Sequence, residues 1–374
     1  MAASHQHGIN GDASAVLVDR ASLELRRGRA VRIADTAAAL LVAPVETAAP
    51  ALLARLLAAA NGRAKLLITA ERAIAAGLAR DLDGPVGIPL PSGADAETLR
   101  ALGGICGGPV LAGPMAFSVD RELGSPRLAA AALALAKAAR LVPALVGFEA
   151  EPGEDREIVQ ISAADVEQHA RAGAASLKLT SKARVPLADA TDCEIALFRA
   201  EHGESEHVAV IIGKPRFDDV VPVRLHSACL TGDLLGSLRC DCGEQLRTAV
   251  SRIASLGGGV LLYLDQEGRG IGLPNKLRAY TLQDAGLDTV DADRHLGFLS
   301  DERNYDVAAV LLEQLGVKRI TLLTNNPQKI SALREHGIEV VGRLPLVGST
   351  NTHNERYLRA KLERAGHLAE ESNG

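Results

Sequence analysis

Three cysteines, Cys229, Cys240 and Cys242, lie within a short polar stretch and are the residues best suited to bind a metal ion. Thiolates are soft ligands that favour zinc. Three protein ligands leave the fourth tetrahedral position open, as catalytic zinc sites do for water. His226 is the only close candidate for a fourth ligand, and it falls on the preceding predicted strand. The number of ligands therefore favours a catalytic zinc over a closed structural site.

A glycine-rich segment at 266–272, Gln-Glu-Gly-Arg-Gly-Ile-Gly, follows a strand predicted at 259–264. Glycines let the backbone approach a ligand and offer amide donors, as in phosphate-binding loops, although a tight turn explains the pattern equally well. Glu267 could pair with the N1–H and amino group of a guanine edge, and Arg269 could hold a phosphate through two hydrogen bonds. These two side chains favour a nucleotide ligand.

Several polar residues beyond this loop have competing explanations. Lys276 and Arg278 could bind phosphate, but a solvated basic helix face explains them better. Tyr280 fits a binding site and a packed core equally well. Asp301 stands where either a base or a helix-capping carboxylate would be expected.

Thr324 and Lys329 lie where a predicted strand passes into a helix N-terminus. Free N–H groups and the helix dipole attract anions at such a place, although capping and solvation explain the two residues almost as well. Thr289 is ambiguous for the same reason. Together, these residues indicate an open zinc site, phosphate-binding elements and a group that recognises a purine edge. That combination predicts hydrolysis of a nucleotide.

Alternating strands and helices in the second half of the chain must position these residues. The polar turn at 214–219 predicts a hairpin, and the strand–helix–strand unit at 319–341 predicts parallel pairing and a mixed α/β (α+β) fold. The predicted strands are 207–213, 222–226, 259–264, 319–323 and 338–341, and the predicted helices are 244–255, 274–285, 306–315, 354–365 and one from Pro327 to a stop at Gly337.

The length of 374 residues predicts two domains. Residues 1–180 contain long alanine-rich runs, whereas residues 181–374 contain the dense clusters of Cys, Asp, Arg and Thr. We therefore predict an alanine-rich α/β N-terminal domain at 1–180 and a domain with a mixed sheet and flanking helices at 181–374. The apolar stretches at 36–60 and 128–148 contain prolines and charged residues, so we expect buried or amphipathic helices rather than membrane spans.

The net charge of −5 and the small number of aromatic residues give no general attraction to nucleic acid or to acidic membranes. Cys106 and Cys193 are far apart in the sequence, and we expect ordinary buried thiols in a reducing compartment. The N-terminus lacks the cationic and apolar regions of a signal peptide. These features predict a cytoplasmic protein that binds neither nucleic acid nor a membrane.

The segments HSACLTGD, LRCDCGEQL, DQEGRGIGLPNKLRAYTLQDAGLDT, DERNYD and LLTNNPQK occur in this order and resemble GTP cyclohydrolase II, the enzyme that opens riboflavin biosynthesis. The resemblance covers about residues 180–368. It implies a homodimer that uses zinc and water to convert GTP into 2,5-diamino-6-ribosylamino-4(3H)-pyrimidinone 5′-phosphate, formate and pyrophosphate. The departure of pyrophosphate also implies Mg²⁺ on the β and γ phosphates.

The resemblance also implies roles for the matching residues. The three cysteines would hold the zinc, Asp301 would accept a proton and Tyr280 would assist at the ring. Arg303 would be either a nucleophile toward the α-phosphorus or a stabiliser of phosphate charge, because an arginine pKa above about 12 makes the covalent role demanding. The residues that would surround GTP are Arg224, Leu225, His226, Ser227, Ala228, Gln245, Glu267, Gly268, Arg269, Thr289, Thr324 and Lys329.

The sequence departs from the family pattern in three places. Ala228 stands where glutamate is frequent, which removes a carboxylate close to the first cysteine, and Asn304 stands where aspartate is usual. The N-terminal half resembles dihydroxybutanone-phosphate synthase only at 26–35, and the acidic loop that should follow is replaced by an alanine- and leucine-rich run. We therefore predict that residues 1–180 are a remnant without that activity.

Three other functions compete with this interpretation. A relative of the same enzyme that acts in pyrimidine catabolism would share the motifs, and a non-catalytic GTP sensor would keep the pocket without releasing formate. A zinc-stabilised nucleic-acid-binding module would need a fourth metal ligand, a basic face and stacking aromatic residues. The composition disfavours this third class.

Overall fold

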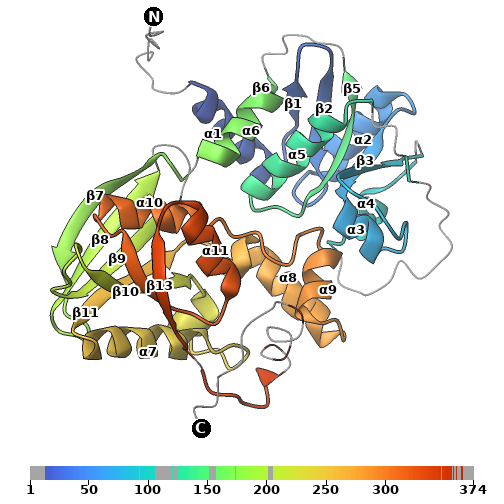
Figure 1. Cartoon of the computed structure of the whole chain (residues 1–374). Coiled ribbons are helices and arrows are strands. Elements are labelled where there is room, and N and C mark those ends of the chain that lie inside the picture. The colour runs from blue at the N-terminus through green and yellow to red at the C-terminus, as the bar shows by residue number, and fades with distance from the viewer. Residues whose placement is uncertain are drawn as a thin grey trace, which may run out of the picture. The chain divides into compact units, whose positions relative to one another are not determined.

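A computed structural model describes the chain at residues 13–91, 93–105, 119–120, 124–150, 157–172, 174–200, 205–346, 348–355, 357, 359 and 364. The chain divides into two compact units, and the division is not contiguous in sequence (Figure 1). The first unit contains Met1–Ala172, Pro274–Leu287 and Asp291–Leu299, and the second contains Gly173–Leu273, Asp288–Val290 and Ser300–Gly374. Two segments from the second half of the sequence therefore fold with the N-terminal half, which a single boundary near residue 180 does not describe.

The first unit is built on a mixed six-stranded sheet with the order β4-β3-β5-β2-β1-β6. Strands β1 and β6 pair in parallel, and the other neighbours are antiparallel. Its strands are β1 (Val31–Ala34), β2 (Ala39–Pro44), β3 (Lys65–Thr69), β4 (Pro85–Pro89), β5 (Ala144–Ala150) and β6 (Val159–Ser162). Its helices are α1 (Ala13–Arg26), α2 (Pro50–Ala60), α3 (Ala70–Ala75), α4 (Ala96–Leu102), α5 (Pro126–Ala138) and α6 (Ala163–Ala172), joined by most of α8 (Leu273–Asp284) and α9 (Thr289–His295).

The second unit has a mixed seven-stranded sheet with the order β13-β12-β10-β11-β9-β8-β7. Strands β13, β12, β10 and β11 are parallel to one another, which confirms the parallel pairing predicted for β12 and β13. Its strands are β7 (Leu177–Arg184), β8 (Cys193–Ala200), β9 (Glu206–Gly213), β10 (Val220–Ser227), β11 (Gly258–Leu264), β12 (Arg319–Leu323) and β13 (Glu339–Leu344), and its helices are α7 (Cys242–Ser255), α10 (Asp306–Gln314) and α11 (Pro327–Glu335).

Both faces of this second sheet are buried. Alternate residues of one strand point to opposite faces of a sheet, so the cores to which they belong show what covers each face. On β11, Val260 and Leu262 belong to the core that includes α10, whereas Leu261 belongs to the core that includes Ile253 of α7. Continuous apolar runs of this kind are typical of strands covered on both faces. Because β10 is parallel to both β11 and β12, the carboxyl ends of these three strands lie at one edge of the sheet. The candidate site residues follow at this edge.

Most predicted elements of the second half are present, but the predicted hairpin at 207–226 is wrong. Strand β11 lies between β9 and β10, pairing antiparallel with β9 and parallel with β10. The fully apolar β11 takes this central position because both of its faces need burial. The predicted helix at 354–365 lies largely outside the described residues, as does Cys106.

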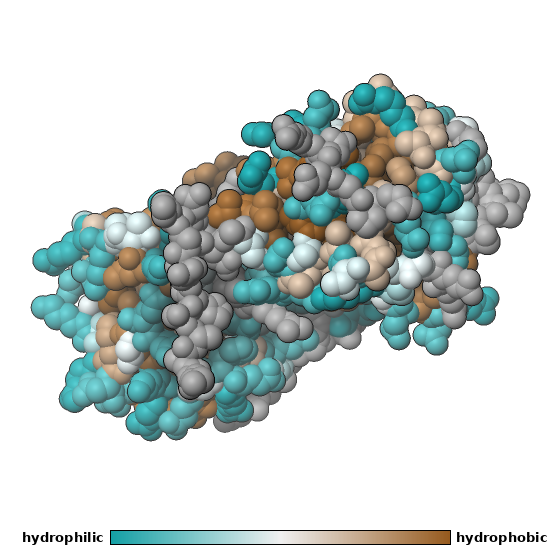
Figure 2. Space-filling model, turned by 90° about the horizontal axis from the view of Figure 1, so that it is seen from above, coloured by the Kyte–Doolittle hydropathy of each residue, from teal (hydrophilic) through white to brown (hydrophobic). Residues whose placement is uncertain are grey.

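The alanine-rich stretches are only partly helical. The stretch at 36–60 forms strand β2 before helix α2, and the stretch at 128–148 continues from α5 into strand β5. A short apolar run does not reveal by periodicity whether it is a strand or a helix, which accounts for this error. Among the described residues, no helix has the length and hydropathy needed to cross a membrane. On the face in Figure 2, hydrophobic residues form limited patches among hydrophilic ones.

Candidate active site

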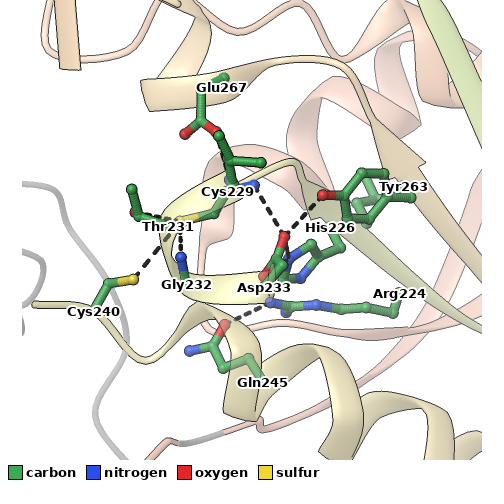
Figure 3. A network of polar contacts seen from close by, with 12 residues as sticks. Arg224, His226, Cys229, Thr231, Gly232, Asp233, Cys240, Gln245, Tyr263 and Glu267 are labelled. Carbon is green, nitrogen blue, oxygen red and sulfur yellow. Dashed lines mark hydrogen bonds and ion pairs between the residues drawn. The ribbon is translucent and has the colours of Figure 1, made fainter. Parts of the chain in front are cut away.

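The three cysteines form one group beside the segment that follows strand β10, and Cys229 and Cys240 are seen next to each other in Figure 3. Cys229 precedes the π-helical turn η1 (Leu230–Leu234), and Cys242 is the first residue of α7. Their sulfur atoms all lie within 4.8 Å of one another, and those of Cys229 and Cys240 are 3.7 Å apart. Two sulfurs bound tetrahedrally to one zinc, each at about 2.3 Å, would be about 3.8 Å apart. The three thiols therefore fit a zinc ion.

Gly232 lies between these sulfur atoms. Its backbone N–H donates a hydrogen bond to the sulfur of Cys229 at 3.3 Å. A Cβ atom at this position would lie 2.7 Å from the sulfur of Cys240 and 3.0 Å from that of Cys229. The space around the three thiols therefore depends on the absence of a side chain at residue 232.

Asp233 joins the first cysteine to strands β10 and β11 (Figure 3). Its carboxylate accepts hydrogen bonds from the backbone N–H of Cys229 at 2.9 Å and from the hydroxyl of Tyr263 at 3.0 Å. The Nε2 atom of His226 lies 3.0 Å from the same carboxylate, and the His226 ring stacks on Tyr263. Sequence reasoning did not single out Asp233 or Tyr263, although Asp233 closes the HSACLTGD motif.

His226 does not complete the metal-ligand group, which among the described residues contains only the three cysteines. Its side chain is buried, its Nε2 faces Asp233, and its Nδ1 has no hydrogen-bond partner in the described part of the chain. Burial lowers the pKa of His226 below its ordinary value, against the opposing effect of Asp233. Ser227 beside it has a buried hydroxyl that likewise lacks a partner among the residues described. The described residues thus leave the centre with three ligands.

Arg224 is a buried cation next to this centre. Its guanidinium donates to the carbonyl of Leu323 at 2.9 Å and to Oε1 of Gln245 at 2.6 Å. The side-chain amide of Gln245 donates in turn to Asp241. Burial lowers the pKa of Arg224 to about 10, so the side chain remains charged at neutral pH. Strand β10 and helix α7 thereby place a positive charge beside the cysteines.

Helix α11 begins at the same edge of the sheet. Asn326 caps its first turn by accepting from the backbone N–H of Gln328 at 2.9 Å, and Thr324 accepts from the N–H of Asn326 at 3.0 Å. The Nζ of Lys329 donates to the carbonyl of Leu225 at 2.8 Å, and the side chain is buried. Lys329 is therefore held toward β10 rather than solvated.

Asp301 and Arg303 form a close ion pair. Arg303 donates to Asp301 from its backbone N–H at 3.0 Å, from Nε at 2.8 Å and from Nη2 at 2.5 Å. Burial opposes ionisation of both groups, but the hydrogen bonds and the opposite charge prevail, so the pKa of Asp301 is lowered and that of Arg303 is raised. The Arg303 guanidinium also lies 5.4 Å from the ring centre of Tyr305.

The glycine-rich loop forms a short 3-10 turn in which Gly268 and Arg269 have positive φ. The buried carboxylate of Glu267 accepts from the backbone N–H of Leu230 at 2.6 Å and from that of Gly268 at 3.0 Å. Arg269 donates to the carbonyl of Ser300 at 3.0 Å. The loop therefore connects the cysteine segment with the segment that carries Asp301.

Ala228 and Asn304, where the family pattern is interrupted, both make local contacts. The N–H of Ala228 donates to the carbonyl of Leu264 at 2.8 Å and extends the pairing of β10 with β11. The Asn304 side chain accepts from the N–H of Asp306 at 2.8 Å, where α10 begins. An aspartate could accept this hydrogen bond equally well, so the bond does not explain the asparagine.

Tyr280 lies on α8, in the first compact unit. The Nζ of Lys276 is 5.7 Å from the centre of its ring, and Lys276 is buried. Arg278 pairs with Glu46 at 2.7 Å, so the expectation of a solvated basic face is wrong. Thr289 is the first residue of α9. The roles of Tyr280 and Thr289 toward a nucleotide stay predictions.

A three-thiol centre beside buried cations and an aspartate–arginine pair, on a mixed α/β fold, defines a candidate metal-dependent enzyme. A profile of the GTP cyclohydrolase II family matches residues 178–345. GTP cyclohydrolase-2 of Azospirillum brasilense is 44% identical over 364 residues, which are 94% of this chain and 93% of that protein. The chain therefore belongs to the GTP cyclohydrolase II family.

Other relatives match a smaller share of the chain. GTP cyclohydrolase-2 of Xylella fastidiosa (strain 9a5c) is 47% identical over 64% of this chain and 61% of that protein. GTP cyclohydrolase-2 of Shewanella sp. (strain W3-18-1) is 55% identical over 44% of this chain and 82% of that protein. A solved two-domain 3,4-dihydroxy-2-butanone 4-phosphate synthase from A. baumannii is 18% identical, with a TM-score of 0.33 over 89% of this chain and 99% of that one. So low a score supports no structural conclusion.

Proposed function

We propose that this protein hydrolyses GTP to 2,5-diamino-6-ribosylamino-4(3H)-pyrimidinone 5′-phosphate, formate and pyrophosphate, the first step of riboflavin biosynthesis. The observation that carries the proposal is the cluster of three thiols within 4.8 Å of one another, in a chain that is 44% identical to a GTP cyclohydrolase-2 over 94% of its length. The reaction makes the protein a hydrolase that acts on a cyclic amidine.

Cys229, Cys240 and Cys242 would hold one zinc ion. When bound, zinc would supply Lewis acidity, which lowers the pKa of a coordinated water toward neutrality. The chain's own contribution is to keep the thiols together: Asp233 fixes the backbone at Cys229, and Gly232 leaves room between the sulfurs. Mg²⁺ would accompany the triphosphate, since oxygen ligands suit that cation.

Glu267 would accept hydrogen bonds from the N1–H and amino group of guanine. The two oxygens of its carboxylate accept from the backbone N–H groups of Leu230 and Gly268, which hold the side chain at the glycine-rich loop. Arg224, Thr324 and Lys329 would bind the phosphates or the base edge. The other residues that would surround GTP are Leu225, His226, Ser227, Ala228, Gln245, Gly268, Arg269 and Thr289. Arg224 and Lys329 are buried, and burial strengthens the attraction of a positive charge for an anion.

Asp301 would accept a proton, because its pairing with Arg303 keeps the carboxylate ionised. The raised pKa of Arg303 favours charge stabilisation at the phosphate over nucleophilic attack, since a protonated guanidinium has no lone pair available. Tyr280 would assist at the ring. We further propose a cytoplasmic homodimer that binds neither nucleic acid nor a membrane, with residues 1–180 inactive as a dihydroxybutanone-phosphate synthase.

The decisive experiment incubates the zinc-loaded protein with GTP and Mg²⁺ while formate, pyrophosphate and the absorbance of the new pyrimidine are followed together. Cys240→Ser should abolish formate release, because the two thiols that remain are too few to hold the zinc ion. Cys193→Ser is the matched control, since Cys193 is a buried free thiol away from the cluster. GTP binding without formate release from the wild-type protein would instead identify a GTP sensor, and a different nucleotide product would favour the relative from pyrimidine catabolism.

A further inference from the structure

Helix α8 is attached to the N-terminal half by a series of polar contacts that begins at Glu46. The Glu46 carboxylate accepts from the backbone N–H of Val142 at 2.8 Å and pairs with Arg278 at 2.7 Å. Arg278 also donates to the side chain of Asn275 at 2.7 Å, and Asn275 donates to the carbonyl of Arg140 at 3.1 Å. The Glu46 side chain is 10% exposed and that of Arg278 is 29% exposed, so this ion pair is partly shielded from water.

Helix α9 and the residues that follow it are attached to the same half by Arg72 and Thr69. Arg72 is buried, and its guanidinium donates to the carbonyl of His295 at 3.1 Å and to two carbonyls at the end of α4 at 2.8 and 2.9 Å. The hydroxyl of Thr69 donates to the carbonyl of Gly297 at 2.8 Å. The last carbonyls of a helix lack partners within that helix and attract a cation. Arg72 thus binds the ends of α4 and α9 together.

These contacts matter because α8 and α9 are short. Helices of 12 and 7 residues are marginally stable in isolation and depend on tertiary packing. The packing comes from the N-terminal half: a Cβ on Gly297 would lie 3.0 Å from Pro143, and Lys137 lies 5.8 Å from the ring centre of the buried Phe298. The segment with Tyr280 therefore belongs to the cyclohydrolase family match but is supported by residues outside it.

We propose that the N-terminal half is an intramolecular scaffold for α8 and α9, with Glu46 and Arg72 as its positioning residues. The consequence for catalysis rests on the proposed function, in which Tyr280 of α8 assists at the ring. Neither Glu46 nor Arg72 needs to touch GTP in this scheme. Glu46 acts by fixing α8, the helix that carries Tyr280, so its loss should affect turnover more than GTP binding. Arg72 acts by fixing the end of α9.

The test compares Glu46→Gln and Arg72→Lys with Glu167→Gln in the full chain. Glu167 is a matched control, because it forms an ion pair with Arg127 in the same unit but at the surface. Hydrogen–deuterium exchange is measured for peptides covering α8 and α9, and zinc content, kcat and KM for GTP are measured on the same samples. The reversed pair Glu46→Arg with Arg278→Glu tests whether the Glu46–Arg278 contact itself is responsible.

We expect exchange in α8 to become about tenfold faster in Glu46→Gln, and exchange in α9 about tenfold faster in Arg72→Lys, with Glu167→Gln unchanged. In Glu46→Gln, zinc content and KM should stay near the wild-type values while kcat falls at least about tenfold, and the reversed pair should recover part of the lost kcat and of the lost protection in α8. Unchanged exchange in α8 and α9 would overturn the scaffold. Faster exchange with unchanged kcat would overturn the positioning role.

A wild-type protein that releases no formate would refute the proposed function instead, and the exchange data would still decide whether the scaffold exists.

Discussion

At the scale of single residues, the site depends on side chains that bind other protein groups rather than a ligand. Asp233 is the main example, since its one carboxylate contacts the backbone of a metal-ligand residue, a histidine and a tyrosine. Groups that hydrogen-bond to metal-ligand residues and orient them commonly change the metal affinity by about 10- to 100-fold when they are removed. Gly232 contributes by the volume it leaves empty.

We expect Asp233→Asn to weaken zinc binding by about 10- to 100-fold. The amide keeps the shape of the carboxylate, but it has one acceptor oxygen instead of two and no charge, so the contacts with Cys229, Tyr263 and His226 are weakened together. Competition with a chromogenic chelator measures the affinity. Asp218→Asn, which changes an exposed aspartate paired with Arg216, should leave it unchanged. Equal zinc affinity in Asp233→Asn and the wild type would show that Asp233 does not support the centre.

We expect Gly232→Ala to reduce zinc uptake strongly, because the new Cβ would lie 2.7 Å from the sulfur of Cys240. Gly236→Ala is the informative control. It introduces a side chain at a positive φ of 66°, which costs roughly 1 kcal/mol of backbone strain, but its Cβ meets no described atom within 4 Å. Metal analysis after gel filtration should show full zinc in Gly236→Ala and little in Gly232→Ala. Similar zinc contents would exclude steric crowding as the reason for glycine at residue 232.

At the scale of elements, the site is built from the carboxyl ends of parallel strands and the helices that follow them. Strands β10, β11 and β12 each lead into a segment with site residues, and the register of β10 between β11 and β12 brings these segments to one edge. Helix α9 has a different role, since its end is buried against α3 and α4. Burial of its last residue, His295, makes this packing sensitive to pH.

We expect the contribution of His295 to folding stability to be lost as the pH falls from about 6.5 to about 4. Burial, with a smaller effect of Arg72, lowers the pKa of His295 to about 4, whereas the unfolded chain has a value near 6.5. Between these values the unfolded state binds the extra proton, so its free energy falls relative to that of the folded state. Above about 6.5 both states are neutral and the contribution is complete.

The measurement is the free energy of unfolding in urea at pH 7 and pH 5. The wild-type protein should lose roughly 1–2 kcal/mol more than His295→Asn over this interval. His353→Asn removes an exposed histidine and should behave as the wild type does. An identical pH dependence in His295→Asn and the wild type would contradict the assignment.

At the scale of the whole molecule, the compact units do not coincide with a division of the sequence. The family match covers 178–345, yet Pro274–Leu287 and Asp291–Leu299 fold with the N-terminal half. Relatives such as the Shewanella protein match this chain over only 44% of its length. In this chain, however, both segments belong to the first unit, and their apolar residues Leu282, Leu296 and Phe298 are buried.

In a fragment of residues 181–374, we expect the free energy of unfolding of α8 and α9 to be several kcal/mol lower than in the full chain. Burying a leucine or phenylalanine side chain contributes about 1.5–3 kcal/mol, and the fragment would expose several of them. Hydrogen exchange should show unprotected α8 and α9 amides, and size-exclusion chromatography should show association beyond the dimer proposed for the full chain. Protection equal to that of the full chain would mean that these helices find equivalent packing without the N-terminal half.

The sequence by itself determined the features that depend on residue type and local spacing. It predicted the three-cysteine centre, strand β12 at its observed bounds, the Pro327 start of α11 and the mixed α/β class, because thiol chemistry, strand propensity and helix capping are local properties. The comparisons confirmed the family that the motifs had indicated.

Only the tertiary structure decided which groups meet across long separations in sequence. It placed β11 between β9 and β10, engaged Asp233 with His226 and Tyr263, and brought Glu46 to Arg278 across 232 positions. Sheet order and ion pairing result from competition among all apolar faces and buried charges of the chain. A local sequence pattern cannot show the outcome of that competition. Arg278, which the sequence placed on a solvated face, is therefore found in an ion pair with Glu46.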